Sequence, residues 1–320
     1  MRPLQFGILS TARICRRGLI PGIRRSGTAQ LVAIASRDKN KAKQWALEFG
    51  IPKEHDSYDA LIADPDIDAV YIPLPNELHK PWVMKAADAG KHILCEKPLA
   101  LDYAEAQEMV AYCEQRKVIL MEAFMWRHHP RVDRVRRMLD AGQLGELRLF
   151  KMDFSFDIDR DDWRLDPTRG GGALYDLGCY GINAARLFTR EEPAEIFVRG
   201  VRHSSGVDMT LGFEMSFASG VVALLDCSFE CPDRNRIELV GTKGAIELPG
   251  GVLPAENSEL IVRTNSGVET ISIPAADQYG LQVKTFCASV AAGKLLDPAE
   301  NGLANMRALW AVKQAFATVT

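Results

Sequence analysis

Residues 92–101, HILCEKPLAL, end a short apolar run with a pair of opposite charges. A strand that only fills a hydrophobic core has no use for Glu96 and Lys97 at its end, whereas a strand that opens onto a ligand does. Pro98 then fixes the direction of the chain, and an X-Pro bond at this point can be cis. We therefore expect Glu96 and Lys97 to face a bound ligand. The alternative is a surface ion pair before a helix.

A second set of reactive side chains follows a run of glycines at 170–172. The sequence GGGALYDLGCYGINAARLF, residues 170–188, is typical of a helix preceded by a glycine-rich turn. Asp176 and Tyr180 are four residues apart, so a helix would project them from one face. The glycines let the backbone before the helix pass close to a ligand. For Tyr180, the alternative is a buried tyrosine whose hydroxyl is satisfied by the protein.

The elements that must position these residues differ between the two parts of the chain. The first 121 residues alternate between continuous apolar runs and helical patterns, which predicts an α/β fold with a doubly wound parallel sheet of the Rossmann type. From residue 145, segments such as ELRLFKMDFSFDID alternate apolar and polar residues, which predicts an open, largely antiparallel sheet. We therefore predict a Rossmann domain over residues 1–121 and an α+β domain over residues 122–320.

The turn after the first predicted strand has the sequence GILSTARI, residues 7–14. Ser10 and Ala12 stand where the GxGxxG fingerprint of dinucleotide sites has further glycines. Small residues still allow backbone N–H groups to approach a pyrophosphate at the positive end of a helix. The alternative is a strand that continues into a helix with a Ser-Thr cap. The predicted dinucleotide contacts in this turn are Gly7, Ser10, Thr11, Ala12, Arg13 and Ile14.

Ser36 and Arg37 follow the second predicted strand, where an NAD site usually has an acid that holds the ribose hydroxyls. A hydroxyl and a planar cation suit a 2′-phosphate instead, so we predict NADP in preference to NAD. The alternatives are a solvated Arg37 and an inward-facing Asp38, which would favour NAD. The rigid IPLPNELH turn after the next long strand adds four candidate cofactor contacts: Pro73, Leu74, Asn76 and His79. For His79, an exposed position on a helix is the alternative.

The composition argues against several classes of function. A net charge of -3, from 39 basic and 42 acidic residues, gives no reason to expect nucleic acid or an anionic membrane as a partner. No apolar run approaches the roughly 18 residues that span a bilayer. No secretory signal precedes the first strand, so we expect a cytoplasmic protein. The seven cysteines contain no CxxC and the six histidines no HExxH, so we expect neither disulfides nor a metal site.

Together these segments resemble the Gfo/Idh/MocA family, named after glucose-fructose oxidoreductase, inositol dehydrogenase and a rhizopine catabolism protein. The resemblance is strongest to its NADP-linked branch, which includes dihydrodiol and D-xylose dehydrogenases, and it spans nearly the whole chain. It implies a second domain that binds substrate and whose open sheet forms oligomers, so we expect a homodimer or homotetramer through this sheet. The segments that carry it are GILSTARI, SRD, PxPNxxH, CEKPLAL, MEAFMWRHHP and GGGALYDLGCYGINAAR.

The resemblance places the family's catalytic lysine at Lys97 and its aspartate at Asp176. Tyr180 stands where many members have histidine, which disfavours an inositol substrate. Tyrosine is a weak base at its reference pKa of about 10, but a nearby Lys97 ammonium would lower that pKa. We therefore predict Tyr180 as the general acid/base and Lys97 as its electrostatic partner, and the exchange of these two roles stays open. Asp176 would hold Lys97 charged or bind a substrate hydroxyl.

Two further segments, MWRHHP and DDWRLDP, contain aromatic and basic residues suited to stacking on a ring and bonding hydroxyls. The predicted substrate contacts are Trp126, Arg127, Trp163, Asp176 and Tyr180, and Trp163 and Arg164 are also predicted at the cofactor. The alternatives are core tryptophans and surface arginines.

We expect an NADP-dependent oxidoreductase that transfers a hydride between the nicotinamide and a sugar or cyclic polyol carbon. The leading expectation is an aldose 1-dehydrogenase of the D-xylose type, which yields a lactone. The alternatives are a trans-dihydrodiol dehydrogenase, a sugar-ketone reductase of the 1,5-anhydrofructose type and a catalytically inactive NADP-sensing regulator. The presence of Lys97, Asp176 and Tyr180 favours an enzyme over a regulator.

Overall fold

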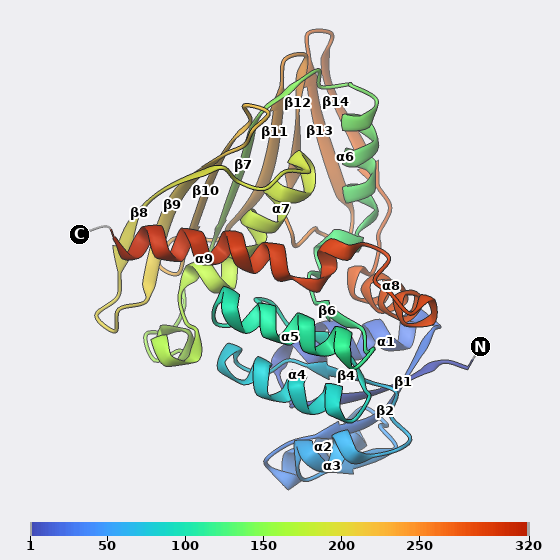
Figure 1. The fold of residues 1–320 in the computed structure, drawn as a ribbon. Helices are drawn as coiled ribbons and strands as arrows, with labels where there is room; N and C mark the ends of the chain where they lie inside the picture. The colour runs from blue at the N-terminus through green and yellow to red at the C-terminus, as the bar shows by residue number, and fades with distance from the viewer. Residues whose placement is uncertain (1, 319–320) are drawn as a thin grey trace. The chain divides into compact units, whose positions relative to one another are not determined.

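The computed structural model describes residues 2–318, which form two compact units (Figure 1). The first unit contains the described residues up to His128 together with Asp277–Met306. The second contains His129–Ala276 together with the described residues from Arg307 onward. The expected division at residue 121 therefore differs from the structure. The first unit extends further, and it also includes a helix from near the end of the chain.

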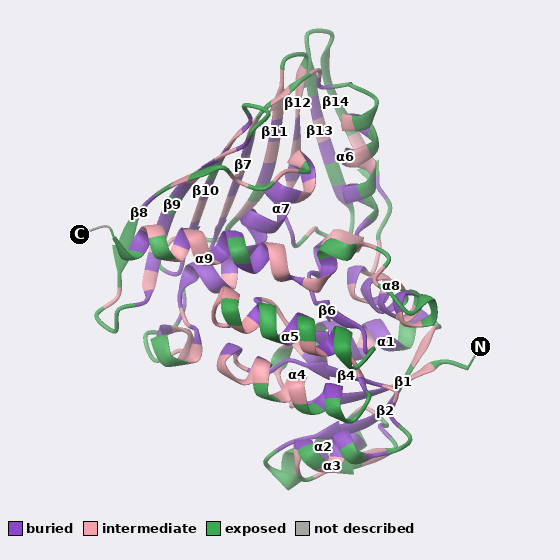
Figure 2. Cartoon of the chain, viewed as in Figure 1, coloured by how far each residue is buried: buried purple, intermediate pink, exposed green. Residues whose placement is uncertain are grey.

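The first unit is built on a six-stranded parallel sheet with the order β3-β2-β1-β4-β5-β6. Strands β4 and β5 are almost entirely buried, which explains their uninterrupted apolar sequences. Figure 2 colours the chain by burial. The predicted Rossmann sheet is thus confirmed. The strands are β1 Leu4–Leu9, β2 Ala29–Ala35, β3 Lys53–His55, β4 Ala69–Ile72, β5 His92–Cys95 and β6 Leu120–Glu122.

Helices cover both faces of this sheet. Phe6 and Ile8 of β1 point into a core that contains residues of α1, α2 and α8, whereas Gly7 between them points to the opposite face. There α3 packs so closely that a β-carbon on Gly7 would lie 2.6 Å from Leu61. The helices are α1 Ile20–Ser26, α2 Lys39–Glu48, α3 Tyr58–Ala63, α4 His79–Asp88, α5 Tyr103–Gln115 and α8 Gln278–Ala292, with short helical turns η1 Cys15–Leu19, η2 Asn76–Leu78, η3 Met125–His128 and η7 Pro298–Asn301.

Helix α8 belongs to the first unit because it packs tightly on η1 and α1. A β-carbon on Gly18 or Gly22 would lie 2.6 or 2.8 Å from the side chain of Tyr279. Deeper in the core, the rings of Phe6 and Phe286 are 5.5 Å apart, and both residues are fully buried. The glycines therefore allow a close helix–helix contact that larger side chains would prevent.

The second unit contains an eight-stranded mixed sheet with the order β14-β13-β12-β11-β7-β10-β9-β8. Strands β7 and β10 pair in parallel, and the other pairs are antiparallel, which confirms the predicted open sheet. The strands are β7 Leu147–Ser155, β8 Glu195–Arg202, β9 Asp208–Ser216, β10 Val222–Ser228, β11 Arg234–Gly241, β12 Gly244–Pro249, β13 Ser258–Thr264 and β14 Gly267–Ile273.

Helices pack on one face of this sheet, and burial alternates along strands such as β9 because the opposite face is open. The helices of this unit are α6 Pro130–Asp140, α7 Cys179–Thr189 and the later part of α9 Leu303–Ala317, with short helical turns η4 Trp163–Leu165, η5 Pro167–Arg169 and η6 Leu174–Gly178. Across residues 2–318, no helix combines the length and the apolar character needed to cross a membrane.

Candidate active site

The turn after β5 presents Lys97 at the carboxyl edge of the first sheet. The carboxylate of Glu96 accepts a hydrogen bond from the hydroxyl of Tyr71, a buried residue of β4. On the other side, Glu122 at the end of β6 accepts a hydrogen bond of 2.8 Å from the backbone N–H of Leu99. The turn is therefore held from both neighbouring strands, which restricts where the Lys97 side chain begins.

His79 links the turn after β5 to the turn after β4. Its ring is fully buried, with Nε2 2.8 Å from the carbonyl oxygen of Leu74 and Nδ1 3.0 Å from that of Pro98, and the Lys97–Pro98 peptide bond is cis. Burial lowers the pKa of His79. We expected His79 to contact the cofactor or to be exposed on a helix. The exposed position is wrong, because both ring nitrogens are buried against backbone carbonyls. The other predicted residues of the β4 turn, Pro73, Leu74 and Asn76, are buried.

The GILSTARI turn leaves β1 and leads into a helix that begins before the π-helical turn η1. Ser10 has a φ of 143°, a conformation that residues other than glycine rarely adopt. The backbone N–H of Cys15 returns a hydrogen bond to the carbonyl of Ala12 at 3.0 Å. The turn contains no carboxylate and lies before the N-terminus of a helix, an arrangement that suits a phosphate. Gly7 lies within β1, where close packing by α3 explains its identity.

The turn after β2 contains the residues predicted to select the cofactor. Ser36 is buried and Arg37 is exposed. The side chain of Asp38 accepts hydrogen bonds from the N–H groups of Asn40 and Lys41, at 3.0 and 3.3 Å, and so caps α2. Asp38 therefore serves its own helix, which removes the complication that an inward-facing carboxylate would have raised for a 2′-phosphate.

In the second unit, Asp176 forms an ion pair with Arg164. The distance from Arg164 Nε to Asp176 Oδ2 is 2.8 Å, and Arg164 Nη1 lies 3.0 Å from Asp162 Oδ2. Burial disfavours the charged guanidinium, yet the two carboxylates raise the pKa of Arg164 overall. The guanidinium also lies 5.3 Å from the centre of the Trp163 ring. Three predicted residues thus form one cluster.

The glycine run before this helix is required by protein neighbours. A β-carbon on Gly171 would lie 2.2 Å from the carbonyl oxygen of Arg164, and one on Gly172 would lie 2.3 Å from Oδ1 of Asp208. Asp208 also accepts a hydrogen bond of 2.5 Å from the backbone N–H of Leu174. We predicted that these glycines admit a ligand, but the contacts that explain Gly171 and Gly172 come from the chain itself.

Asp176 and Tyr180 belong to one helical segment, as predicted, but this segment changes from a π-helical turn to an α-helix between them. Asp176 is part of η6, and Tyr180 is on the first turn of α7. Turns of this kind recur at functional sites because they shift the helical register locally. The Tyr180 ring is buried and packs against Phe154 at 5.8 Å.

The MWRHHP segment forms η3, and its side chains are held within the first unit up to His128. Trp126 is almost completely buried, and Arg127 Nη2 lies 2.6 Å from Asp297 Oδ2. His128 Nε2 lies 3.6 Å from the buried carboxylate of Glu300. Burial lowers the pKa of His128 to about 3 and raises that of Glu300 to about 7. The Arg127 and His128 side chains of this segment thus lie against carboxylates of the same unit.

The predicted residues therefore gather in two sets, each within its own unit. In the first unit most of them lie in or just after the turns that follow β1, β2, β4 and β5, whereas Gly7 lies within β1 and Trp126 and Arg127 lie in η3. In the second, Trp163, Arg164 and Asp176 lie together, and Tyr180 follows on the same helix. Residues 2–318 contain no group of three or more His, Cys, Asp or Glu side chains placed to hold a metal ion.

Comparison with known proteins gives these two sets a family context. A model described as oxidoreductase family, NAD-binding Rossmann fold, matches residues 4–124, and one described as GFO/IDH/MocA C-terminal domain matches residues 132–247. A D-xylose 1-dehydrogenase (NADP(+)) from Haloferax volcanii is 39% identical over 295 residues, which cover 91% of this chain and 90% of the relative. The chain belongs to the Gfo/Idh/MocA oxidoreductase family.

Two further relatives of this Gfo/Idh/MocA protein differ in activity. A trans-1,2-dihydrobenzene-1,2-diol dehydrogenase from Mus musculus is 36% identical over 232 residues, 72% of this chain and 70% of the relative. The crystal structure of a 3-ketoreductase from Actinomadura kijaniata in complex with NADP and TDP-benzene has a TM-score of 0.91 and 32% identity, and 98% of each chain is covered. The Gfo/Idh/MocA protein is an NAD(P)-dependent oxidoreductase that acts on CH–OH groups.

Proposed function

We propose that this Gfo/Idh/MocA oxidoreductase is an NADP-dependent aldose 1-dehydrogenase that oxidises a D-xylose-like sugar at C1 to a lactone. The observation that carries the proposal is the turn after β5, which holds Lys97 at the carboxyl edge of a Rossmann sheet. The 39% identity to a D-xylose 1-dehydrogenase supports the choice of substrate.

The proposed chemistry separates a hydride from a proton. When bound, the nicotinamide accepts the hydride from the sugar carbon. Tyr180 takes the hydroxyl proton, and the Lys97 ammonium makes this possible by lowering the pKa of the phenol. Asp176, paired with Arg164, binds a neighbouring hydroxyl or keeps Lys97 charged. The same residues run in reverse protonate a carbonyl oxygen, and the roles of Tyr180 and Lys97 can be exchanged.

NADP is the proposed cofactor, in preference to NAD. Arg37 is exposed beside the buried Ser36, and the nearest carboxylate in sequence, Asp38, is occupied as the cap of α2. A cation and hydroxyls without a facing carboxylate suit a 2′-phosphate. The remaining predicted cofactor contacts are Gly7, Ser10, Thr11, Ala12, Arg13, Ile14, Pro73, Leu74, Asn76, Glu96, Trp163 and Arg164.

A trans-dihydrodiol dehydrogenase is the second candidate, because a relative at 36% identity has that activity. A sugar-ketone reductase is the third, because the ketoreductase structure covers 98% of the chain at a TM-score of 0.91. A regulator that binds NADP without turnover is disfavoured, since Lys97, Asp176 and Tyr180 are all present.

A substrate panel tests the proposal. Purified protein is incubated with NADP or NAD and with aldopentoses, aldohexoses and a trans-dihydrodiol, and the absorbance of reduced nicotinamide is followed. With NADPH, sugar ketones are tested in the opposite direction. We expect the fastest NADP reduction with D-xylose or a related aldose, together with a lactone product. NADP binding without turnover on any compound would replace the enzyme with a regulator.

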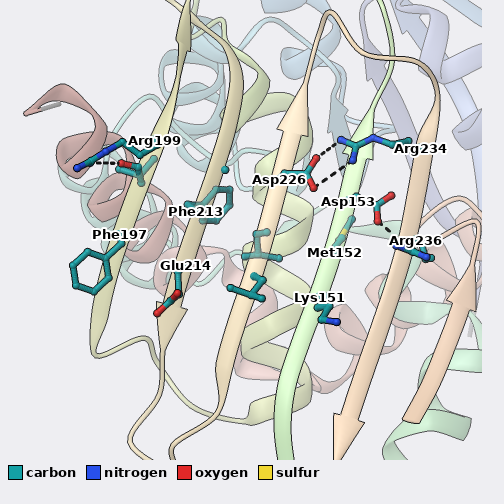
Figure 3. Close-up of a pocket in the computed structure, with 14 residues that line it drawn as sticks. Lys151, Met152, Asp153, Phe197, Arg199, Phe213, Glu214, Asp226, Arg234 and Arg236 are labelled. Carbon is teal, nitrogen blue, oxygen red and sulfur yellow. Dashed lines mark hydrogen bonds and ion pairs between the residues drawn. The ribbon is translucent and has the colours of Figure 1, made fainter. Parts of the chain in front are cut away.

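We also propose that two copies associate through the open face of the eight-stranded sheet, which Figure 3 shows. Phe197 on β8 and Leu224 on β10 are 64% and 41% exposed, and both align in register with Glu214 on β9 between them. Exposed apolar residues amid charges of both signs suit a two-fold contact, in which each patch meets its own copy. Two ion pairs lie on the same face, Arg234 with Asp226 and Arg236 with Asp153.

A further inference from the structure

Asp208, the first residue of β9, contacts the segment that leads to Asp176. Its Oδ2 atom accepts the hydrogen bond of 2.5 Å from the backbone N–H of Leu174. Its Oδ1 atom fills the space beside Gly172, where a β-carbon would lie 2.3 Å away. Gly172 also has a φ of 115°, a conformation that residues with side chains rarely adopt. One carboxylate thus holds two residues that come shortly before Asp176.

Gly172 connects Asp208 to the ion pair between Arg164 and Asp176. The N–H of Gly172 donates a hydrogen bond of 2.9 Å to the carbonyl of Arg164, and its carbonyl accepts one of 3.2 Å from the N–H of Asp176. Arg164 and Asp176 meet again through their side chains, with 2.8 Å between Nε and Oδ2. These three residues therefore form a closed set of contacts, and a shift of Gly172 would move both members of the ion pair.

The rest of the turn η6 has a separate attachment to the last helix. Lys313 of α9 donates a hydrogen bond of 3.0 Å to the hydroxyl of Tyr175, and its ammonium lies 4.3 Å from the centre of the ring. Tyr175 is 1% exposed, so this contact satisfies a polar atom in the interior. Loss of Asp208 should therefore displace the backbone before Tyr175 without unfolding the turn.

We propose that Asp208 is a positioning residue for Asp176, because its contacts with Gly172 and Leu174 fix where the Asp176 carboxylate lies beside Arg164. This inference rests on the proposed catalytic role of Asp176 and adds the residue that places it. Displacing a reacting group by about 1 Å can cost about a hundredfold in rate, so a contact remote from the substrate can control turnover. Asp208 acts here as an acceptor for a backbone N–H, so an amide of the same shape should replace it.

The first test measures the contact between Asp208 and Gly172 by thermal unfolding of the full-length protein. Gly172→Ala should lower the melting temperature, because its methyl group would meet Oδ1 of Asp208. In an Asp208→Ala protein the same replacement should lower the melting temperature less, since only the backbone strain at position 172 remains. An equal decrease in both proteins would refute the contact and the inference with it.

The second test measures kcat with the substrate that is turned over fastest in the panel. We expect Asp208→Ala to lower kcat about ten- to hundredfold. Asp208→Asn should retain most of the activity, because its amide oxygen still accepts from the N–H of Leu174. Glu191 is the matched control, since its carboxylate accepts a hydrogen bond of 3.0 Å from the N–H of Ser219 in the same unit. Glu191→Ala should leave kcat unchanged.

A double variant separates positioning of Asp176 from a general structural role. In an Asp176→Asn enzyme, Asp208→Ala should cause little further loss of kcat, because both changes act through one carboxylate. A further loss as large as that in the wild type would refute the inference. A wild-type kcat for Asp208→Ala, when Asp176→Asn is impaired, would also refute it and leave the proposed function standing. If Asp176→Asn turns over normally, or the panel contains no substrate, the proposed function fails first and the inference fails with it.

Discussion

Arg164 Nε lies 2.8 Å from Asp176 Oδ2, and the same guanidinium contacts Asp162. The segment before the glycine run thus supplies a cation to the aspartate that follows it. Asp176 is therefore part of an ion-pair network within the second unit, and the catalytic contribution that we propose for Asp176 should depend on Arg164.

Replacing Arg164 tests this dependence. We expect Arg164→Ala to lower kcat/KM at least tenfold, because Asp176 loses the cation beside it. Arg164→Lys should recover part of the loss, since it restores charge without the planar fork. Steady-state kinetics with the best sugar give both values. An Arg164→Ala enzyme with wild-type kcat/KM would show that the pair has no role in turnover.

The proton-transfer roles predict a different result. Tyr180→Phe and Lys97→Met should each reduce kcat roughly a hundredfold or more, because general acid–base catalysis contributes on that scale. Binding of 2′,5′-ADP, the fragment of NADP that contains the ribose phosphate and lacks the nicotinamide, should stay unchanged if the first unit remains folded. Near-normal turnover by either variant would exclude that residue from proton transfer.

Replacing the buried His79 should lower the stability of the folded protein. His79→Leu should lower the free energy of unfolding by about 1–3 kcal/mol, because the neutral ring donates its one N–H to a buried carbonyl, that of Leu74 or of Pro98, and this carbonyl loses its donor. His79→Gln and His79→Asn are the matched variants, since each can place a side-chain amide where one of the two ring nitrogens of His79 lies. Urea unfolding measures all three. Equal stability of the leucine variant and the wild type would contradict the positioning role.

The pH dependence of stability should reflect His128. Its pKa is about 3 in the folded protein and about 6.5 when unfolded, so the unfolded chain binds more protons between these values. Stability should therefore fall as the pH decreases from about 6.5 toward 4. His128→Asn should flatten this part of the curve in urea titrations at several pH values, and an unchanged slope would assign the effect to other groups.

Glu300 should act in the opposite direction. Its pKa is raised to about 7 by burial, so the stability it contributes is complete below about 4.5 and is lost as the pH rises through 7. Glu300→Gln should therefore gain stability relative to the wild type between pH 5 and pH 8. A difference that does not vary with pH would show that the carboxyl is ionised throughout this range.

The open sheet face predicts an oligomer that a single charge can disrupt. Phe197→Asp should shift the protein to monomers in light scattering coupled to size-exclusion chromatography, because it buries a charge against the second copy. Leu47→Asp, at a 75% exposed position on α2 in the first unit, is the control and should change nothing. A wild-type protein that is already monomeric would refute the proposed contact.

The long elements could be predicted because their periodicity is strong. Apolar runs identified β1, β2, β4, β5 and β6, and alternation identified most of the second sheet. Strand β3 and helix α3 have only three and six residues, too few to show a period, so neither element could be foreseen. The packing of α8 on the first unit was also hidden, since periodicity does not reveal which sheet a helix covers.

Residues of the candidate site could be predicted where their position depends only on the order of the strands in the sheet. The turns after β1, β2, β4 and β5 must share one sheet edge, which placed Lys97 and Arg37. The role of His79 was not predictable, because its partners are backbone carbonyls with no sequence pattern. Asp208 was missed for a related reason, as it meets Gly172 and Leu174 only through the fold.

The position of α8 has a consequence for how the protein is made. Phe286 contributes a ring to the core around Phe6, yet 279 residues lie between these two positions in the sequence. A ribosome-bound chain that has emerged only as far as residue 128 still lacks this part of its nucleotide-binding half. An N-terminal fragment that ends at residue 128 would therefore lack part of this core, which is complete only after α8 has been synthesised.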